Sequence, residues 1–280
     1  MAGKLYVVGT PLGNLGDMTP RAVQILCEVD FIAAEDTRVT QKLLHHFEIP
    51  TPAVSYHEHN RLSRGDEIVA RLLAGESCAV VTDAGMPCIS DPGEDLVRLC
   101  AVHGVEVLVV PGPSAVIAAL AVSGLPTARF RFEGFLSTAR KNRIARLREL
   151  AEDRSTLIFY EAPHKLRTTL ADLLAELGDR RISLCRELTK LHEEVVRTTL
   201  SEAVARYGEG KDGDARIRGE FVLVVEGAPE QVVEAPPLEQ AIAHAQTLVS
   251  EGMRPSDAAK AAAKETGYPK GEIYAGMLRD

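Results

Sequence analysis

The sequence lacks the features that mark membrane and secreted proteins. Its longest apolar runs, such as residues 105–110, are far shorter than the ~20 residues that a membrane-spanning helix needs. The chain opens with Met-Ala-Gly-Lys and a strand-like run instead of an apolar signal segment, and no Asn-x-Ser/Thr sequon occurs. We therefore expect a cytoplasmic protein that does not enter a membrane.

Cysteine is scarce and does not follow a metal-binding pattern. The five cysteines are odd in number and widely scattered, and none forms a Cys-x-x-Cys pair. This usage predicts buried small side chains in a reducing compartment, not disulfides or a zinc site. His57 and His59 could pair on a metal, but no third and fourth ligand lie near them in the sequence. No metal site is predicted.

Two common nucleotide-binding fingerprints are also missing. The glycines at 9, 13 and 16 have the spacing G-x3-G-x2-G, which differs from G-x-G-x-x-G, and no Gly-Lys-Ser/Thr occurs. Pro11 would also remove a backbone N–H from a phosphate cradle in this loop. These absences disfavour a Rossmann or P-loop protein.

Positive charge is scarce overall but concentrated in one stretch. The 32 Lys and Arg residues against 40 Asp and Glu give a net charge of −8, which argues against a general nucleic-acid coat. Residues 126–148 are the exception, since their only acidic residue is Glu133. Their basic residues are Arg129, Arg131, Arg140, Lys141, Arg143, Arg146 and Arg148. We interpret this basic stretch as a phosphate-contacting surface for RNA, and the alternative is a solvated helix face.

The same stretch carries three of the few aromatic residues. Phe130, Phe132 and Phe135 alternate roughly as side chains do along a strand. Because a period of two directs side chains to one face, we expect these rings to lie in the core and not to act as stacking platforms.

Apart from these absences, the chain alternates strand-like and helix-like segments. At 280 residues it is long enough for about two domains. Strand-like runs at 5–9, 31–35, 53–56, 78–82 and 105–110 are separated by helical patterns. This order predicts an α/β fold with βαβ units and a mainly parallel sheet. A second α/β unit has strand-like runs at 130–135, 156–161, 182–186 and 221–226. We predict α/β domains at 1–124 and 125–228, then a linker and a small helix–turn–helix-like module at 229–280.

Polar, Gly-rich and Pro-rich loops follow the predicted strands of the first domain. The clearest are residues 83–93 and 111–114. Glycine allows close approach of the backbone to a ligand, and proline fixes the loop shape in advance. Because ligands of open α/β sheets bind at the carboxyl ends of the strands, these loops predict a cleft for an adenosine-type ligand. The alternative is a set of rigid turns.

Four segments together carry a family resemblance: residues 7–15, 35–38, 82–93 and 111–115. In them the chain resembles the tetrapyrrole-methylase superfamily, whose members are S-adenosylmethionine (SAM) enzymes of the class III fold. The segment Glu-Asp-Thr-Arg at 35–38 is typical of one branch of that superfamily. That branch methylates the 2′-hydroxyl of a cytidine in the decoding region of 16S ribosomal RNA, in the small ribosomal subunit. Residues 160–165 and 186–190 fit the same branch.

The resemblance implies that SAM lies in a cleft between the two α/β domains, and that the protein is a homodimer. The implied cofactor contacts are Leu12, Asp83, Met86, Ser114, Ala115, Tyr160, Cys185 or Arg186, and Phe221 or Val222. The role that it implies for the C-terminal module is contact with the ribosomal subunit or with the partner protomer, and simple packing is the alternative.

Methyl transfer to a ribose oxygen requires orientation of that oxygen, exclusion of water and removal of a proton. We predict that Asp36 and Arg38 position the nucleotide or remove the proton, with Glu187 as a further candidate from the other domain. Asp36 could instead cap the following helix. Other candidate bases in the cleft loops are Glu35, His57, Glu58 and Lys190. Two other functions stay open: methylation of a precorrin-type macrocycle, and a non-catalytic RNA-binding module.

Overall fold

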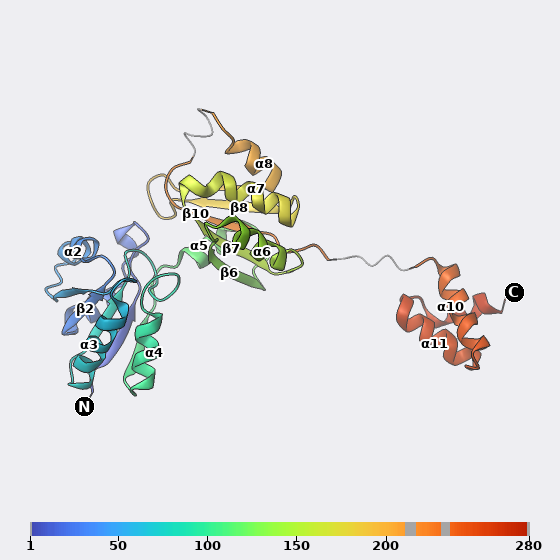
Figure 1. Cartoon of the computed structure of the whole chain (residues 1–280), viewed down its shortest axis with the longest axis horizontal. Helices are drawn as coiled ribbons and strands as arrows, with labels where there is room; N and C mark the ends of the chain where they lie inside the picture. The colour runs from blue at the N-terminus through green and yellow to red at the C-terminus, as the bar shows by residue number, and fades with distance from the viewer. Residues whose placement is uncertain (1, 211–216, 231–235, 279–280) are drawn as a thin grey trace. The chain divides into compact units, whose positions relative to one another are not determined.

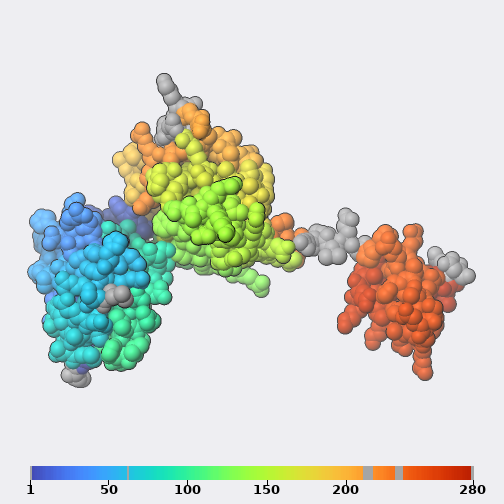
Figure 2. Space-filling view, in the orientation of Figure 1, coloured from blue at the N-terminus to red at the C-terminus, as the bar shows by residue number. Residues whose placement is uncertain are grey.

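The computed structural model of the chain describes residues 2–210, 217–230 and 236–278. The chain divides into two compact units, residues 1–228 and 229–280 (Figures 1 and 2). The predicted boundary between residues 124 and 125 therefore lies inside the first unit, and it stays a prediction. The predicted linker falls partly outside the described residues.

A five-stranded parallel sheet forms the N-terminal half of the first unit, as predicted. Its strand order is β3-β2-β4-β1-β5, and every neighbouring pair is parallel. The strands are β1 (Lys4–Val8), β2 (Phe31–Ala34), β3 (Ala53–Ser55), β4 (Cys78–Val81) and β5 (Glu106–Val110). The central strands β2 and β4 are buried along their whole length, which explains their continuous apolar sequence.

Helices cover both faces of this sheet. They are α1 (Pro20–Glu28), α2 (Thr37–His46), α3 (Arg61–Leu73) and α4 (Glu94–Val102), with a 3-10 turn η1 (Leu15–Asp17). Ile32 packs in the core on the side of α1 and α2, whereas Phe31 packs on the side of α3 and α4. Thr19 caps α1 by accepting a hydrogen bond from the backbone of Ala22, and Pro20 occupies the first helical position.

A second five-stranded sheet follows, with the order β6-β7-β10-β8-β9. Its strands are β6 (Phe130–Phe135), β7 (Thr156–Glu161), β8 (Arg181–Arg186), β9 (Glu194–Thr199) and β10 (Phe221–Val225). Only β6 and β7 pair in parallel, and the other neighbours are antiparallel. Strand β9 was not predicted, because this partly exposed edge strand has mostly charged and hydroxyl side chains.

Two helical layers enclose the second sheet. On one face lie α6 (Arg140–Leu150), α7 (Leu166–Leu177) and α8 (Leu200–Arg206), preceded by the 3-10 turn η2 (Pro163–Lys165). On the other face lies α5 (Ala115–Ser123), whose Val116 and Leu120 share a core with Val222 and Val224. Helix α5 follows β5 in the chain, yet it packs on the second sheet.

Strand β6 corrects the expectation for its aromatic residues. Phe130 is 42% exposed and Phe135 is 57% exposed, so neither ring is in the core. The pairing of β6 with β7 shifts between Phe132 and Gly134, and Gly134 has a φ of +66°. This bulge keeps Phe130, Phe132 and Phe135 on one face, but β6 is the edge strand of its sheet, so that face is only partly covered.

The second unit is a module of three helices in its described residues. Its helices are α10 (Leu238–Ser250), α11 (Pro255–Thr266) and α12 (Lys270–Met277). Their core consists mainly of alanines, with Ile273 as its largest buried side chain. In both units, no helix within the described ranges is long and apolar enough to cross a bilayer.

Candidate active site

A cavity of about 350 Å³ lies in the first unit, where loops of the first sheet meet strands of the second. The first half of this unit, up to residue 115, contributes Leu12, Glu35, Thr82, Asp83, Ala84, Gly85, Met86, Ile89, Asp91, Ser114 and Ala115. The second half, which follows residue 115, contributes Phe135, Tyr160, Glu161, Ala162, Cys185, Glu187, Leu188, Lys190, Glu220, Phe221 and Val222. The volume is within the range of small-molecule sites, and the loops follow the carboxyl ends of parallel strands.

Close backbone contacts hold the loops of the first half together. The backbones of Thr10 and Gly85 form two hydrogen bonds, of 2.9 and 3.1 Å. A Cβ added to Gly9 would lie 2.7 Å from the Cα of Gly112, and one on Gly112 would lie 2.8 Å from the Cα of Gly9. Only glycine allows this approach, so the wall of the cavity is formed before a ligand binds.

The cavity is lined mainly by acidic groups among its charged residues. Its carboxyl side chains are Glu35, Asp83, Asp91, Glu161, Glu187 and Glu220. Lys190 is the single basic residue in that lining as described, and its Nζ lies 3.0 Å from Glu187. The arrangement therefore favours a ligand that carries positive charge.

Two of these carboxyls have raised pKa values. Burial, together with the nearby charge of Glu35, raises the pKa of Asp91 to about 6. Burial and Glu35 also raise the pKa of Asp83. The hydroxyl of Thr82 donates a 2.6 Å hydrogen bond to Glu35 and also contacts Asp91. Perturbed carboxyls in a cavity are typical of functional sites, because ordinary surface carboxyls are solvated or paired.

The structure brings the predicted cofactor residues together, with one exception. All of them line the cavity except Arg186. The guanidinium of Arg186 instead lies 3.0 Å from the carboxylate of Glu194 on the neighbouring strand. Their contact with a cofactor stays a prediction.

The three predicted catalytic residues are not equivalent. Glu187 lines the cavity, whereas Asp36 and Arg38 lie outside its lining. Asp36 caps α2 by accepting a hydrogen bond of 2.8 Å from the backbone of Arg38. The guanidinium of Arg38 binds the same carboxylate and holds the pKa of Asp36 at about 2. These contacts match the capping alternative, and a catalytic role for Asp36 stays a prediction.

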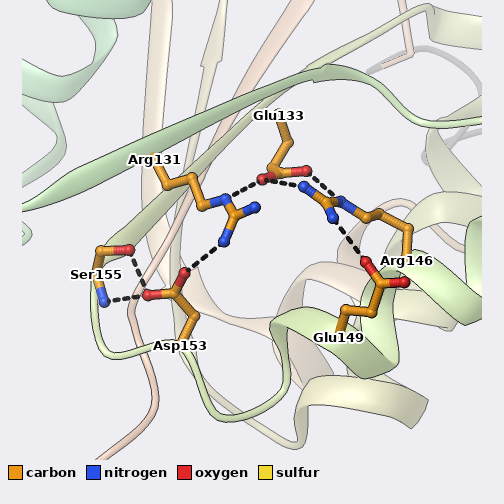
Figure 3. Close-up of polar contacts among 6 residues, drawn as sticks. All are labelled: Arg131, Glu133, Arg146, Glu149, Asp153 and Ser155. Atoms are coloured by element: carbon orange, nitrogen blue, oxygen red, sulfur yellow. Dashed lines mark hydrogen bonds and ion pairs between the residues drawn. The ribbon is translucent and has the colours of Figure 1, made fainter.

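Ion pairs neutralise much of the predicted basic stretch. Figure 3 shows Arg131 between Glu133 and Asp153, and Arg146 between Glu133 and Glu149. Arg148, further along α6, pairs with Glu176 at 2.8 Å. The local charge of the sequence is therefore not the charge that a ligand would meet.

The structure corrects the prediction that Arg143 contacts RNA. Arg143 is only 7% exposed, and its Nε donates a 2.7 Å hydrogen bond to Asp172. Its Nη1 donates to the carbonyls of Ser137 and Thr138. These bonds fix the guanidinium inside the second half, out of reach of a phosphate.

Three members of the basic stretch remain accessible. Arg129, Arg140 and Lys141 are exposed, and no ion pair joins them to a carboxylate within residues 2–210, 217–230 and 236–278. The residues near 140 lie on the face of the second half that is turned to the viewer in Figure 2. A phosphate-contacting surface would consist of these three residues.

Several cavity residues were absent from the predicted site. Asp91 and Ile89 lie in a loop whose importance the Gly and Pro spacing had indicated. Glu220 could have been found as the acidic residue directly before the apolar run of β10. Phe135 could not, because its position depends on the bulge in β6. Within the part of the chain that the structure describes, no group of three or more His, Cys, Asp or Glu could hold a metal.

Comparison with known proteins gives this geometry a family. Residues 4–204 match the family of tetrapyrrole (corrin/porphyrin) methylases. Ribosomal RNA small subunit methyltransferase I of Synechocystis sp. is 49% identical over 273 residues, covering 97% of this chain and 96% of that protein. The protein of the same name from Bacillus subtilis is 45% identical over 278 residues, covering 97% and 93%.

Solved structures share the fold at low sequence identity. Uroporphyrin-III C-methyltransferase from Thermus thermophilus, in complex with S-adenosylhomocysteine, matches 79% of this chain and 97% of its own with a TM-score of 0.56 and 21% identity. A cobalt precorrin-4 methyltransferase matches 80% of this chain and 94% of its own with a TM-score of 0.60 and 18% identity. The fold and the sequence relatives agree, and the chain belongs to the tetrapyrrole (corrin/porphyrin) methylase family.

Proposed function

We propose that the protein is a SAM-dependent methyltransferase that acts on 16S ribosomal RNA in the small ribosomal subunit, at the 2′-hydroxyl of a cytidine in the decoding region. The observation that carries the proposal is the acidic cavity at the strand ends. It suits a cationic nucleoside cofactor. Relatives named ribosomal RNA small subunit methyltransferase I, similar over nearly the whole chain, support the choice of substrate.

The residues of the cavity fit the chemistry of SAM. When bound, SAM supplies a methyl group carried on a positively charged sulfur. The carboxylates of Asp83 and Asp91 match that charge, and the apolar side chains of Leu12, Met86 and Val222 match the adenosine. The close contact between Gly9, after β1, and Gly112, after β5, keeps this wall in place without the cofactor.

Asp91 is the carboxylate of the cavity best suited to accept a proton from the ribose hydroxyl. In the unliganded site, its pKa of about 6 leaves it ionised at pH 7 to 8 and makes it more basic than an ordinary aspartate. With SAM bound, the bond from the ribose oxygen to the methyl carbon would form as the bond from that carbon to the sulfur breaks, leaving a neutral thioether, and the hydroxyl proton would pass to this carboxylate. Asp36, with a pKa of about 2, is a weaker acceptor. Its partner Arg38 has a largely exposed side chain, and we assign the pair to nucleotide positioning.

Phosphates of the RNA are held by Arg129, Arg140 and Lys141. They have exposed side chains with no carboxylate partner in the described parts of the chain. The acidic cavity repels phosphates, so the backbone of the RNA stays outside while a ribose is presented at the mouth.

An exposed apolar face supports the assignment as a homodimer. Helix α5 is apolar on all sides, and its Ile117 and Val122 are exposed. A second copy of the chain would cover this face. Sedimentation of the wild type should show a dimer, and Ile117→Lys with Val122→Lys should give a monomer. Val102→Lys, at an exposed valine of α4, should leave the dimer intact. A monomeric wild type would contradict the assignment.

The substrate can be tested with SAM carrying a labelled methyl group. The protein is incubated with assembled small subunits, with naked 16S ribosomal RNA and with a tetrapyrrole. We expect the label in a 2′-O-methylated cytidine of the assembled subunit. This nucleoside is recovered after digestion of the RNA to nucleosides. Transfer to the macrocycle would identify a precorrin-type enzyme. Absence of transfer to all three, with RNA binding intact, would identify a binding module.

A further inference from the structure

We infer that Phe135 is a stacking platform for the nucleobase of the acceptor nucleotide at the mouth of the cavity. This inference deepens the proposed function and rests on it. Phe135 lines the cavity while remaining 57% exposed, so its ring belongs to the site and is also accessible from solvent. An exposed ring at the mouth of a site offers a surface on which an unstacked base can bind.

The backbone of β6 directs Phe135 to the cavity. The register shift between Phe132 and Gly134 adds a residue to the alternation, and Gly134 takes a φ of +66°. In a regular strand, residue 135 would lie on the opposite face from residues 130 and 132, because the faces alternate with every residue. The bulge brings residue 135 to the same face as residues 130 and 132. Glycine is suited to residue 134 because its backbone is left-handed.

Neighbouring aromatic rings hold Phe135 without covering it. Its ring meets Tyr160 at a centroid distance of 5.5 Å and an interplanar angle of 61°. Tyr160 in turn meets Phe132 at 4.9 Å and 68°. Because these contacts are edge-to-face, Tyr160 can occupy at most one face of the Phe135 ring, and the exposed area is available to a base.

An apolar side chain from the first half lies at the same cavity. Ile89, in the loop after β4, lines the cavity and is 51% exposed. The next residue in that loop approaches β6, since a Cβ on Gly134 would lie 3.2 Å from the Oγ of Ser90. Phe135 and Ile89 thus supply exposed apolar groups from both halves at one opening.

The charges of the site separate the base from its phosphates. The carboxyl groups inside the cavity, such as Asp83 and Asp91, repel a phosphodiester but not an uncharged base. The expected ligand is therefore a base of single-stranded or opened RNA, with its backbone outside. A pyrimidine follows from the proposed cytidine acceptor.

The test compares Phe135→Ala with Phe130→Ala. Both residues are exposed phenylalanines of β6, but Phe130 does not line the cavity. Methyl transfer to assembled small subunits is measured together with SAM affinity by calorimetry. We expect Phe135→Ala to lower kcat/KM about tenfold or more, largely through KM, with SAM affinity within about twofold of the wild type. Phe130→Ala should match the wild type. Phe135→Tyr, which keeps an aromatic face, should restore most of the activity, and Phe135→Leu should not.

Two outcomes would overturn the inference: equal effects of the two alanine variants, or a loss of SAM affinity in Phe135→Ala that accounts for its lower activity. The second outcome would place the ring against the cofactor. A readout without turnover uses a short single-stranded RNA with a fluorescent cytidine analogue. Its quenching by the wild type should be lost in Phe135→Ala and kept in Phe130→Ala. If the wild type quenches this RNA but does not methylate subunits, the proposed function fails, and with it the acceptor role of the bound base, although Phe135 still binds a base.

Discussion

Two groups of carboxylates in the first unit differ in whether a basic side chain pairs with them. Around β6 and α6, Glu133, Glu149 and Asp153 each meet a guanidinium (Figure 3). In the cavity, Glu35 and Asp91 share the hydroxyl of Thr82, and no salt bridge joins either one to a basic side chain of the described residues. The first group neutralises arginines that would otherwise repel one another. The second keeps its charge for a ligand.

The comparison teaches that pairing, not residue type, separates structural charges from functional ones. The hydrogen bonds that Arg146 donates to Glu133 and Glu149 raise its pKa, so the paired groups stay charged. Burial beside other carboxylates makes Asp91 harder to ionise. Repulsion destabilises the ionised carboxylates of such a cluster when no ligand is bound, and a cationic ligand would reduce that repulsion.

The largest expected effect lies in the buried pair of Arg143 and Asp172. Arg143→Ala should lower the free energy of unfolding by about 3–5 kcal/mol, because Asp172 is left buried without its partner. Urea unfolding at pH 7 measures the change. The double variant Arg143→Met, Asp172→Leu should recover much of the loss, since no charge is then stranded. A loss below about 1 kcal/mol in the single variant would place this pair with ordinary surface pairs.

Removal of the charge of Asp91 should weaken binding of the cofactor. We expect Asp91→Asn to raise the Kd for SAM by about tenfold at pH 7.5, equivalent to ~1.4 kcal/mol. The pKa of Asp91 is about 6, so protonation in the wild type should weaken SAM binding as the pH falls through 6. The variant should show a flatter profile over this range. Calorimetry between pH 5 and 8 measures both, and identical profiles would contradict a role for this carboxylate.

The stability of the unliganded protein should change in the opposite direction. The pKa of Asp91 is raised from 3.8 to about 6, so the folded state prefers the protonated form. That contribution is fully present below pH 3.8 and is lost as the pH rises through 6. Asp91→Asn should therefore raise the Tm at pH 7.5 and change it little near pH 4. A lower Tm at pH 7.5 would show that the ionised carboxylate stabilises the fold.

The accessible basic residues should contribute a smaller, salt-dependent effect. Arg140→Gln with Lys141→Gln should weaken binding of small subunits a few-fold and lower the slope of log K against log salt by about two. Arg131→Gln serves as the matched control, because its guanidinium already meets Glu133 and Asp153. If each of the three substitutions weakened the binding of small subunits equally, ion pairing would not decide which basic residues contact RNA.

The smallest effect is expected at the exposed pair of Arg148 and Glu176. The side chain of Arg148 is 70% exposed, and solvent screens such pairs strongly. Arg148→Ala should change the free energy of unfolding by less than about 1 kcal/mol in the same urea experiment. A loss comparable to that of Arg143→Ala would remove the distinction between buried and exposed pairs.

Local patterns predicted much of the fold and part of the site. The apolar runs of β2 and β4 indicated a parallel sheet, and the Gly and Pro loops after the strands indicated the cavity that Met86 and Ser114 line. Both depend on signals within a few residues. The partners of the basic stretch do not: Asp172 is 29 residues from Arg143, and Glu176 is 28 residues from Arg148. Such pairings arise only when α6 and α7 pack together, so the predicted patch was too large.

Helix α5 has a consequence for how the protein can be divided. Its chain neighbours belong to the first sheet, but Val116, Ala119 and Leu120 complete the core of the second. A fragment that starts at residue 125 would lose this cover and expose Val222 and Val224 to water. The natural cut lies between β5 and α5, at the loop of residues 111–114 that also forms part of the cavity. The link between the two halves and part of the cavity wall are the same short segment, so a change in the spacing of the halves would change the cavity where the cofactor is expected.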